Sequence, residues 1–139
     1  MSKVAVVFWS GTGNTEIMAN AVKEGAVGAG ADVTIFGCEF AAGNVAEFDA
    51  IAFGCPAMGA EVLEESEFEP MFSAVENSLS GKKVALFGSY GWGDGQWMRE
   101  WEARTSGTGA QILGIVMANS APDDSVLEEC KVLGATLAK

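Results

Sequence analysis

Histidine is absent from the 139 residues of this chain, and cysteine occurs only three times. Without histidine, acid–base catalysis near neutral pH would depend on carboxylates, lysines or a single tyrosine, which argues against proton-shuttling hydrolysis. The cysteines, Cys38, Cys55 and Cys130, form neither a C-x-x-C pair nor a zinc-binding pattern. We therefore expect reduced thiols, no metal site, and no residue that acts as acid, base or nucleophile toward an organic substrate.

Basic residues are also scarce, because eight Lys and Arg oppose 19 Asp and Glu and leave a net charge of −11. Proteins that bind nucleic acid neutralise its phosphates with Lys and Arg, so this composition argues against a nucleic-acid partner. A strongly acidic protein instead favours partner proteins with basic docking patches. The alternative interpretation is that the acidity only keeps the protein soluble.

Long hydrophobic segments are missing, and no apolar run approaches the roughly 20 residues that a membrane helix needs. The chain enters a β-like run at Val4 without the basic region, longer apolar segment and cleavage site of a signal peptide. No Pro/Gly/Ser-rich linker divides the chain, and its length suits one domain. We expect a single domain over residues 1–139 that is monomeric and cytoplasmic and has no membrane partner.

The apolar runs that are present alternate between strand and helix patterns. Residues 4–9 form an unbroken apolar run, which predicts a central strand buried on both faces. Asn44, and a capping box of Ser66 with Glu69, are predicted to begin two of the helices. Five β-α units imply an α/β fold, a doubly wound parallel sheet with helices on both faces. The other strands are predicted at residues 32–36, 49–55, 83–89 and 112–117.

The loop after the first strand has a composition that suits an anion. Its two glycines let the backbone approach a ligand, its hydroxyls and amide can donate hydrogen bonds, and it opens onto a helix N-terminus. It lacks the Gly-Lys-Ser/Thr ending of nucleoside-triphosphate loops, the third glycine of dinucleotide loops, and any Lys or Arg. We therefore predict a phosphate held by neutral donors, the alternative being a glycine-rich turn without a ligand. The loop residues are Ser10, Gly11, Thr12, Gly13, Asn14 and Thr15.

Two further loops, at residues 54–61 and 88–95, indicate a site for a flat aromatic ligand. Trp92 stands between glycines, where neither helical nor strand periodicity explains it, and Met58 also lies off any apolar stripe. An aromatic ring and a polarizable thioether can cover the two faces of a planar ligand. For Met58, packing against the core is an equally good interpretation. A redox role for Cys55 is disfavoured, because no resolving cysteine is near it in sequence.

At these loops the chain resembles the flavodoxins, specifically the short-chain clostridial type of anaerobic bacteria. The resemblance runs from Val4 to the C-terminal helix and implies a flavodoxin-like sheet with strand order 2-1-3-4-5. Ala60 departs from it, because many relatives carry Asp, Asn or Ser there. The segments that match the phosphate loop, the inner flavin loop and the outer flavin loop are, in that order, Ser10-Gly11-Thr12-Gly13-Asn14-Thr15, Ala57-Met58-Gly59 with Glu61, and Ser89-Tyr90-Gly91-Trp92-Gly93.

The resemblance implies roles toward a bound flavin mononucleotide (FMN). Met58 would lie on the inner flavin face and Trp92 on the outer, while Glu61 would accept a hydrogen bond from flavin N3–H. The Gly59 carbonyl would meet N5–H after the first electron, and Asn119 would approach from the end of the fifth strand. The implied FMN site comprises Ser10, Gly11, Thr12, Gly13, Asn14, Thr15, Pro56, Ala57, Met58, Gly59, Ala60, Glu61, Ser89, Tyr90, Gly91, Trp92, Gly93 and Asn119.

The function that the resemblance implies is that of a low-potential one-electron carrier. Its non-covalently bound FMN would cycle between semiquinone and hydroquinone, and the protein would replace a ferredoxin between redox enzymes without converting a substrate. Its partners would be ferredoxin-type reductases and oxidoreductases with basic docking patches.

Two alternatives from other functional classes remain. A phosphoreceiver of this fold needs paired acidic residues after the first strand and an Asp after the third, where this chain has Trp9-Ser10 and Gly54-Cys55. A flavin enzyme could hold its cofactor with the same three loops. The short chain, which lacks a second substrate domain, weighs against that enzyme.

Overall fold

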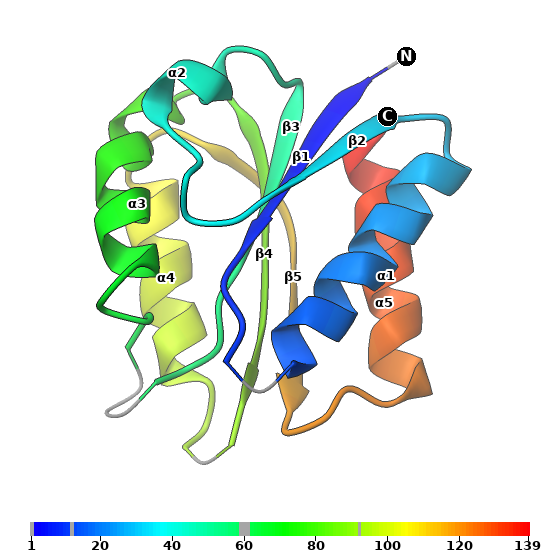
Figure 1. Ribbon diagram of the computed structural model, residues 1–139, viewed down its shortest axis with the longest axis vertical. Helices are drawn as coiled ribbons and strands as arrows, with labels where there is room; N and C mark the ends of the chain where they lie inside the picture. Colours follow the sequence, from blue (N-terminus) through cyan, green and yellow to red (C-terminus); the bar gives the residue numbers. More distant parts are fainter. Residues whose placement is uncertain (1, 12, 59–61, 92) are drawn as a thin grey trace.

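The computed structural model describes residues 2–11, 13–58, 62–91 and 93–139. Five parallel strands form one sheet in the order β2-β1-β3-β4-β5, which confirms the predicted order, and helices cover both faces of the sheet (Figure 1). No helix among these residues combines the length and the apolar composition needed to cross a membrane. The elements are β1 (Lys3–Phe8), α1 (Asn14–Gly28), β2 (Asp32–Phe36), α2 (Ala42–Val45), β3 (Ala50–Gly54), α3 (Phe68–Val75), a 3-10 turn (Glu76–Ser78), β4 (Lys83–Tyr90), α4 (Gln96–Ser106), β5 (Gln111–Asn119) and α5 (Asp124–Leu137).

β1 lies at the centre of the sheet. It pairs in parallel with β2 along one edge and with β3 along the other, and residues 4–7 are completely buried. An unbroken apolar run is what a strand covered on both faces requires, so the predicted central strand is confirmed. The strand ends at Phe8, however, and Trp9 belongs to the loop that follows.

The helices form two layers, with α1 and α5 on one face of the sheet and α3 and α4 on the other (Figure 1). Gly25 and Gly134 allow α1 and α5 to approach closely. A Cβ atom at Gly134 would overlap with the carbonyl oxygen of Val22, and one at Gly25 would overlap with that of Lys131. The two glycines therefore fix the position of α1, and with it the place where α1 begins at the edge of the sheet.

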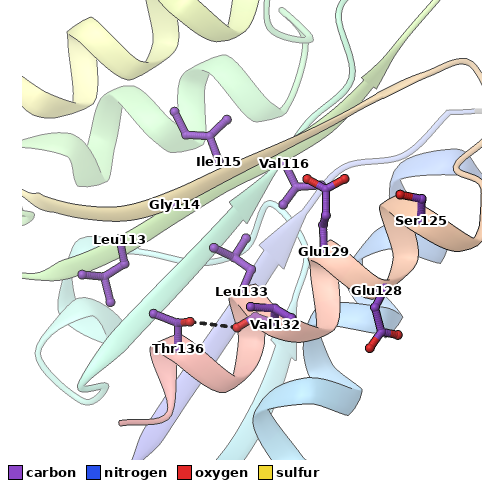
Figure 2. Close-up of a pocket in the computed structure, with 10 residues that line it drawn as sticks. All are labelled: Leu113, Gly114, Ile115, Val116, Ser125, Glu128, Glu129, Val132, Leu133 and Thr136. Carbon is purple, nitrogen blue, oxygen red and sulfur yellow. Dashed lines mark hydrogen bonds between the residues drawn. The ribbon is translucent and has the colours of Figure 1, made fainter.

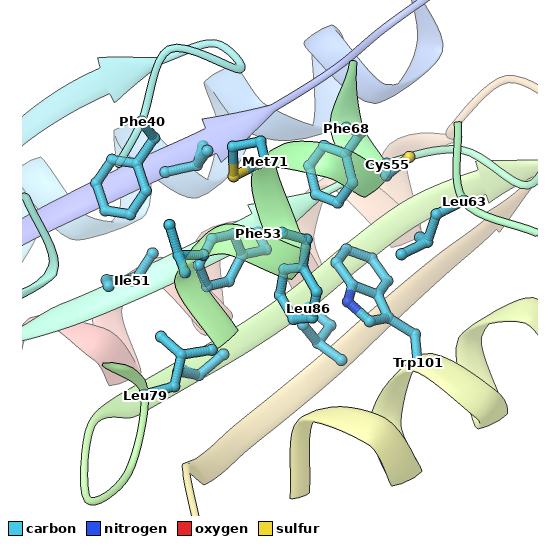
Figure 3. Close-up of a cluster of buried hydrophobic side chains, with 14 of the residues drawn as sticks. Phe40, Ile51, Phe53, Cys55, Leu63, Phe68, Met71, Leu79, Leu86 and Trp101 are labelled. Atoms are coloured by element: carbon cyan, nitrogen blue, oxygen red, sulfur yellow. The ribbon is translucent and has the colours of Figure 1, made fainter. Parts of the chain in front are cut away.

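The two faces of the sheet have different cores. On the α3 and α4 face the buried cluster is rich in aromatic rings (Figure 3). The Phe68 and Trp101 rings, for example, meet edge to face with centroids 5.5 Å apart. On the α1 and α5 face the buried residues are mostly alanine and valine. Large rings on one face and small aliphatic groups on the other both exclude water from the sheet.

The predicted start of α2 is wrong. The helix begins at Ala42, two residues before Asn44. The side-chain oxygen of Asn44 accepts a hydrogen bond from the backbone N–H of Ala41 at 3.0 Å. Asn44 thus lies within the first turn of α2 and stabilises the helix N-terminus by accepting a hydrogen bond from the residue that precedes the helix.

The predicted capping box at the start of α3 is also wrong. Glu64, which is 7% exposed, occupies the capping role instead of Ser66. Its carboxylate accepts hydrogen bonds from the backbone N–H groups of Ser66, Glu67 and Phe68, at 2.9, 2.8 and 2.9 Å. A carboxylate can accept several N–H groups at once, and its negative charge is stabilised at a helix N-terminus, so it displaces the weaker hydroxyl cap.

Candidate functional site

The carboxyl ends of β1, β3 and β4 meet at one edge of the sheet, the lower edge in Figure 1, and lead into the three loops singled out from the sequence. The chain passes from β1 to β2 on one side and then to β3 on the other side, so the strand order reverses between β1 and β3. Ligands of doubly wound folds bind outside such a reversal. A pocket of about 240 Å³ lies there, lined by Trp9, Gly11, Asn14, Pro56, Ala57, Met58, Ser89, Tyr90, Gly91 and Ser120.

The described lining of this pocket contains no charged side chain. Its apolar part comes from two aromatic rings, a thioether, a proline and an alanine, and its polar part from one amide, two serine hydroxyls and the tyrosine hydroxyl. A planar ring can pack against the first group, and a phosphate can accept hydrogen bonds from neutral donors such as the second. The pocket therefore has the chemistry predicted for a phosphate-bearing aromatic ligand.

Ser10 organises the first loop around the start of α1. Its Oγ accepts hydrogen bonds from the backbone N–H groups of Gly13, at 3.1 Å, and Glu16, at 3.3 Å. Gly13 has a φ of 98°, a conformation that glycine adopts far more readily than other residues. Asn14, the first residue of α1, lines the pocket. The helix N-terminus, where N–H groups lack intrahelical acceptors, therefore adjoins the pocket.

Thr15 has an internal partner. It is 1% exposed, and its Oγ1 shares a hydrogen bond of 3.4 Å with the Oγ of Ser89. Ser89 belongs to β4 and itself lines the pocket. The bond between the two hydroxyls thus joins the first turn of α1 to the end of β4 and fixes the position of the first loop relative to the third.

The second loop stays paired with β4 and then closes on itself. The Ala57 N–H donates to the Ser89 carbonyl at 2.9 Å. Met58 and Val62 exchange two backbone hydrogen bonds, of 2.8 and 3.0 Å, on either side of residues 59–61. Met58 is 36% exposed and lines the pocket, which favours contact with a ligand over the alternative of packing in the core.

The third loop leaves the sheet at Tyr90, which lines the pocket together with Gly91. The Tyr90 carbonyl accepts a hydrogen bond from the Ser120 N–H at 2.6 Å, and Ser120 has a φ of 62°, which is uncommon outside glycine. Asn119 pairs with Tyr90 as the last residue of β5 and is exposed. Ser120 lines the pocket and Asn119 does not, and the implied approach of Asn119 to the flavin stays a prediction.

The predicted site residues fall into three groups according to their place in the structure. Those that the pocket brings together are Gly11, Asn14, Pro56, Ala57, Met58, Ser89, Tyr90 and Gly91. Those that belong to the same loops or strand ends without lining the pocket are Ser10, Gly13, Thr15, Gly93 and Asn119. Those that lie outside the described residues, so that their implied roles stay predictions, are Thr12, Gly59, Ala60, Glu61 and Trp92.

Trp9 is a pocket residue that sequence reasoning missed. Its apolar side chain continues the hydrophobic run of β1, so its pattern predicts a strand residue. The structure instead places it just beyond the strand, where its ring lines the pocket. A Cβ atom at Gly11 would lie 3.0 Å from Cη2 of this ring, so the indole packs directly against the first loop. Its position immediately before the phosphate loop was the one available signal.

The thiols near the site are kept protonated. Cys55 is completely buried, and burial is the largest cause that raises its pKa far above that of an ordinary thiol. The pKa of Cys38 is raised to about 11, mainly by burial and then by the negative charges of Glu67 and Glu64. Reactive cysteines need an accessible thiolate, which neither residue offers at neutral pH. All three cysteines are free, as predicted.

A larger hollow of about 570 Å³ lies between β5 and α5 (Figure 2). Glu128 and Glu129 line it, and it shares no residue with the pocket at the three loops. Two carboxylates would repel a phosphate, and the hollow lies along β5 rather than at the reversal of strand order. The pocket at the three loops is therefore the better candidate for the ligand.

Comparison with known proteins identifies the family. The sequence profile described as Flavodoxin matches residues 6–134. The chain is 50% identical to a flavodoxin of Megasphaera elsdenii over 137 residues, which cover 98% of each chain. It is 45% identical to a flavodoxin of Clostridium beijerinckii over 134 residues, which cover 96% of this chain and 97% of the other. The solution structure of two-electron reduced Megasphaera elsdenii flavodoxin superimposes with a TM-score of 0.90 over 97% of this chain and 98% of that one.

The fold, the uncharged pocket and these matches define an FMN-binding electron-transfer protein rather than a substrate-converting enzyme. The chain belongs to the flavodoxin family, and within it to the short-chain, clostridial type. Flavodoxins are a standard illustration of ligand binding at a reversal of strand order, so the position of the pocket agrees with the family. The function is that of a low-potential one-electron carrier that can replace a ferredoxin.

Proposed function

We propose that FMN binds in the pocket at the three loops, with its phosphate at the first loop and its ring between the second and third. The observation that carries this proposal is the set of residues that line the pocket. They come from all three loops and include two aromatic rings and Asn14, the first residue of α1. The flavin would supply the one-electron chemistry, so the side chains around it need only bind and orient it. The affinity difference between FMN and riboflavin tests the proposal.

The phosphate is held by neutral donors of residues 10–15. Ser10 uses its oxygen to accept two backbone N–H groups and keeps its own O–H proton for the ligand. Asn14 offers its amide from the first position of α1. The hydroxyl of Thr12 and the N–H groups at the start of the helix complete the set. Thr15 contributes by holding the loop in place through Ser89.

In this proposal Met58 and Trp92 would cover the two faces of the ring, and Gly59 and Glu61 would meet its polar edge. Hydrogen bonds between Met58 and Val62 fix both ends of the three residues that bear those groups. On the outer side, Trp97 donates from its indole N–H to the Cys55 carbonyl at 3.2 Å, which anchors α4 to the second loop. The second loop, which would contact the ring, is therefore fixed in position by its hydrogen bonds to β4 and to α4.

The protein acts on other redox proteins, and we propose that these dock through basic patches. Acidic side chains gather around the three loops and are exposed there, and the net charge of −11 has the same sign. Opposite charges accelerate encounter and orient the partner toward the pocket. We further propose a cytoplasmic monomer whose 139 residues form one domain. The exposed acidic residues within the three loops or in the segments that follow them directly are Glu16, Glu65, Glu67 and Asp94.

The rate of electron transfer to a basic partner protein is expected to fall by roughly tenfold or more between about 10 and 300 mM salt, because ions screen the attraction that brings the proteins together. Stopped-flow measurement of the second-order rate constant gives the result. Reduction by an uncharged small molecule serves as the control and should be nearly independent of salt. A protein-to-protein rate that does not change with salt would exclude electrostatic docking.

A further inference from the structure

One hydrogen bond joins a residue of the pocket wall, Trp9, to Glu67, a residue outside the pocket. The indole Nε1–H of Trp9 donates to Oε2 of Glu67 at 2.8 Å. Trp9 follows β1 and lines the pocket, whereas Glu67 is exposed and immediately precedes α3. The two residues are 58 positions apart in sequence. The bond therefore spans the sheet edge from the first loop to the segment that follows the second.

We propose that Glu67 is a positioning residue for the FMN site: its carboxylate holds the Trp9 indole against the first loop. This inference rests on the proposed binding of the FMN phosphate by that loop. The Trp9 ring packs on Gly11 so closely that a Cβ atom there would lie 3.0 Å from it. A Trp9 ring held by Glu67 therefore limits the motion of the loop backbone. Without this hydrogen bond the ring could move, and the loop could adopt more conformations.

The contacts of Glu67 continue to the second loop. Its backbone N–H donates to Oε1 of the buried Glu64 at 2.8 Å. The backbone N–H of Glu64 donates in turn to Sγ of Cys55 at 3.4 Å. Cys55 directly precedes Pro56 of the pocket. Glu67 therefore anchors Trp9 to a point that is itself fixed to the base of the second loop.

The expected consequence is preorganisation. A glycine-rich loop loses conformational freedom when it closes on a ligand, and contacts that order it beforehand reduce this loss. Because Trp9 packs on the first loop, the smaller loss of conformational freedom should strengthen the binding of the phosphate. Glu67 should therefore strengthen the binding of FMN and leave that of riboflavin almost unchanged, although its carboxylate is not part of the pocket lining.

A set of matched variants separates the hydrogen bond from the charge. Glu67→Ala removes both, whereas Glu67→Gln removes the charge and keeps an oxygen that can accept the indole N–H. Trp9→Phe keeps a ring and removes the donor. Glu65→Ala is the control, because Glu65 is an exposed carboxylate of the same segment whose side chain makes no hydrogen bond or ion pair within the described part of the chain.

Two measurements are made on each variant: the dissociation constants of FMN and riboflavin, and the ¹H–¹⁵N NMR signal of the Trp9 indole, which its loss in Trp9→Phe identifies. We expect Glu67→Ala to weaken FMN binding roughly fivefold to tenfold and to shift the indole signal upfield, with riboflavin binding changed less than about twofold. Glu67→Gln and Glu65→Ala should bind FMN within about twofold of the wild type.

Three results would overturn the inference. An indole signal that moves in Glu67→Ala while FMN affinity stays constant would show a bond without a positioning role. Equal losses of FMN affinity in Glu67→Gln and Glu67→Ala would show that an oxygen able to accept the indole N–H does not maintain the affinity, and would exclude this hydrogen bond as the cause. Equal weakening of FMN and riboflavin would mean that the bond does not act through the phosphate loop. Failure of the phosphate site itself is distinguishable, because the wild-type protein would then bind both flavins equally.

Discussion

Apoprotein titrated with the two flavins is expected to bind FMN at least about a hundredfold more tightly than riboflavin. The two ligands differ only in the phosphate, and each charge-assisted hydrogen bond contributes roughly 1.5–3 kcal/mol. Two such bonds already give about 3 kcal/mol, which is more than a hundredfold in affinity. In the proposed site, the Ser10 hydroxyl, the Asn14 amide and the N–H groups at the start of α1 would be the donors. Quenching of flavin fluorescence on binding measures both constants.

The salt dependence of the same titration adds a second test. The net charge of −11 repels a phosphate dianion at long range, and salt screens this repulsion beyond about 8–10 Å. FMN affinity should therefore rise modestly with ionic strength, opposite to the fall expected for a phosphate held by lysine or arginine. Thr12→Ala should weaken FMN far more than riboflavin. Equal constants for the two flavins would contradict the phosphate assignment.

Replacement of Glu64 is expected to have the second large effect, on stability. Glu64→Ala leaves three backbone N–H groups at the start of α3 without their acceptor and should lower the free energy of unfolding by about 2–4 kcal/mol. Glu64→Gln keeps one acceptor oxygen and should cost about half as much. Glu65→Ala, at an exposed neighbouring position, should change it by less than about 0.5 kcal/mol. Urea unfolding of the apoprotein measures all three.

The pH dependence of this effect has a defined sign. Burial alone would raise the pKa of Glu64, but the three N–H groups outweigh it, and the pKa lies below that of an ordinary glutamate. The stabilisation is therefore fully present above the unfolded-state pKa of about 4.3 and is lost as pH falls through the lower folded-state pKa. The stability gap between wild type and Glu64→Gln should narrow below about pH 4. A gap that is constant from pH 7 to pH 3 would contradict the carboxylate cap.

The regular elements could be predicted from sequence because their patterns are local. The buried run of residues 4–7 indicates a central strand by composition alone, and the glycines before α1 indicate the loop that leads into this helix. The cap of α3 could not be predicted, because Glu64 and Ser66 both precede the helix and only the tertiary position of Glu64 brings its oxygens to the N–H groups. Local pattern identifies a candidate cap, and packing selects the one that forms.

The pocket was predictable to the level of loops rather than of every residue. Trp9 has the composition of the strand that it follows, so only the end of pairing at Phe8 shows that it faces the pocket. Ser120 lines the pocket because the backbone turns there, with a φ of 62°, after the last strand pair, which is formed by Tyr90 and Asn119. The positions of Trp9 and Ser120 both depend on where a strand ends. That point is set by pairing with the neighbouring strands and cannot be read from the local sequence.

Stepwise reduction of the FMN complex tests the central claim, that this chain carries single electrons, most directly. Anaerobic titration with a reductant, followed by absorbance and by potential, should show two separate one-electron steps. The yellow protein should turn blue after the first step and pale after the second, and the second step should have the much lower potential. A single two-electron step from yellow to pale, with no blue form at any potential, would contradict the account.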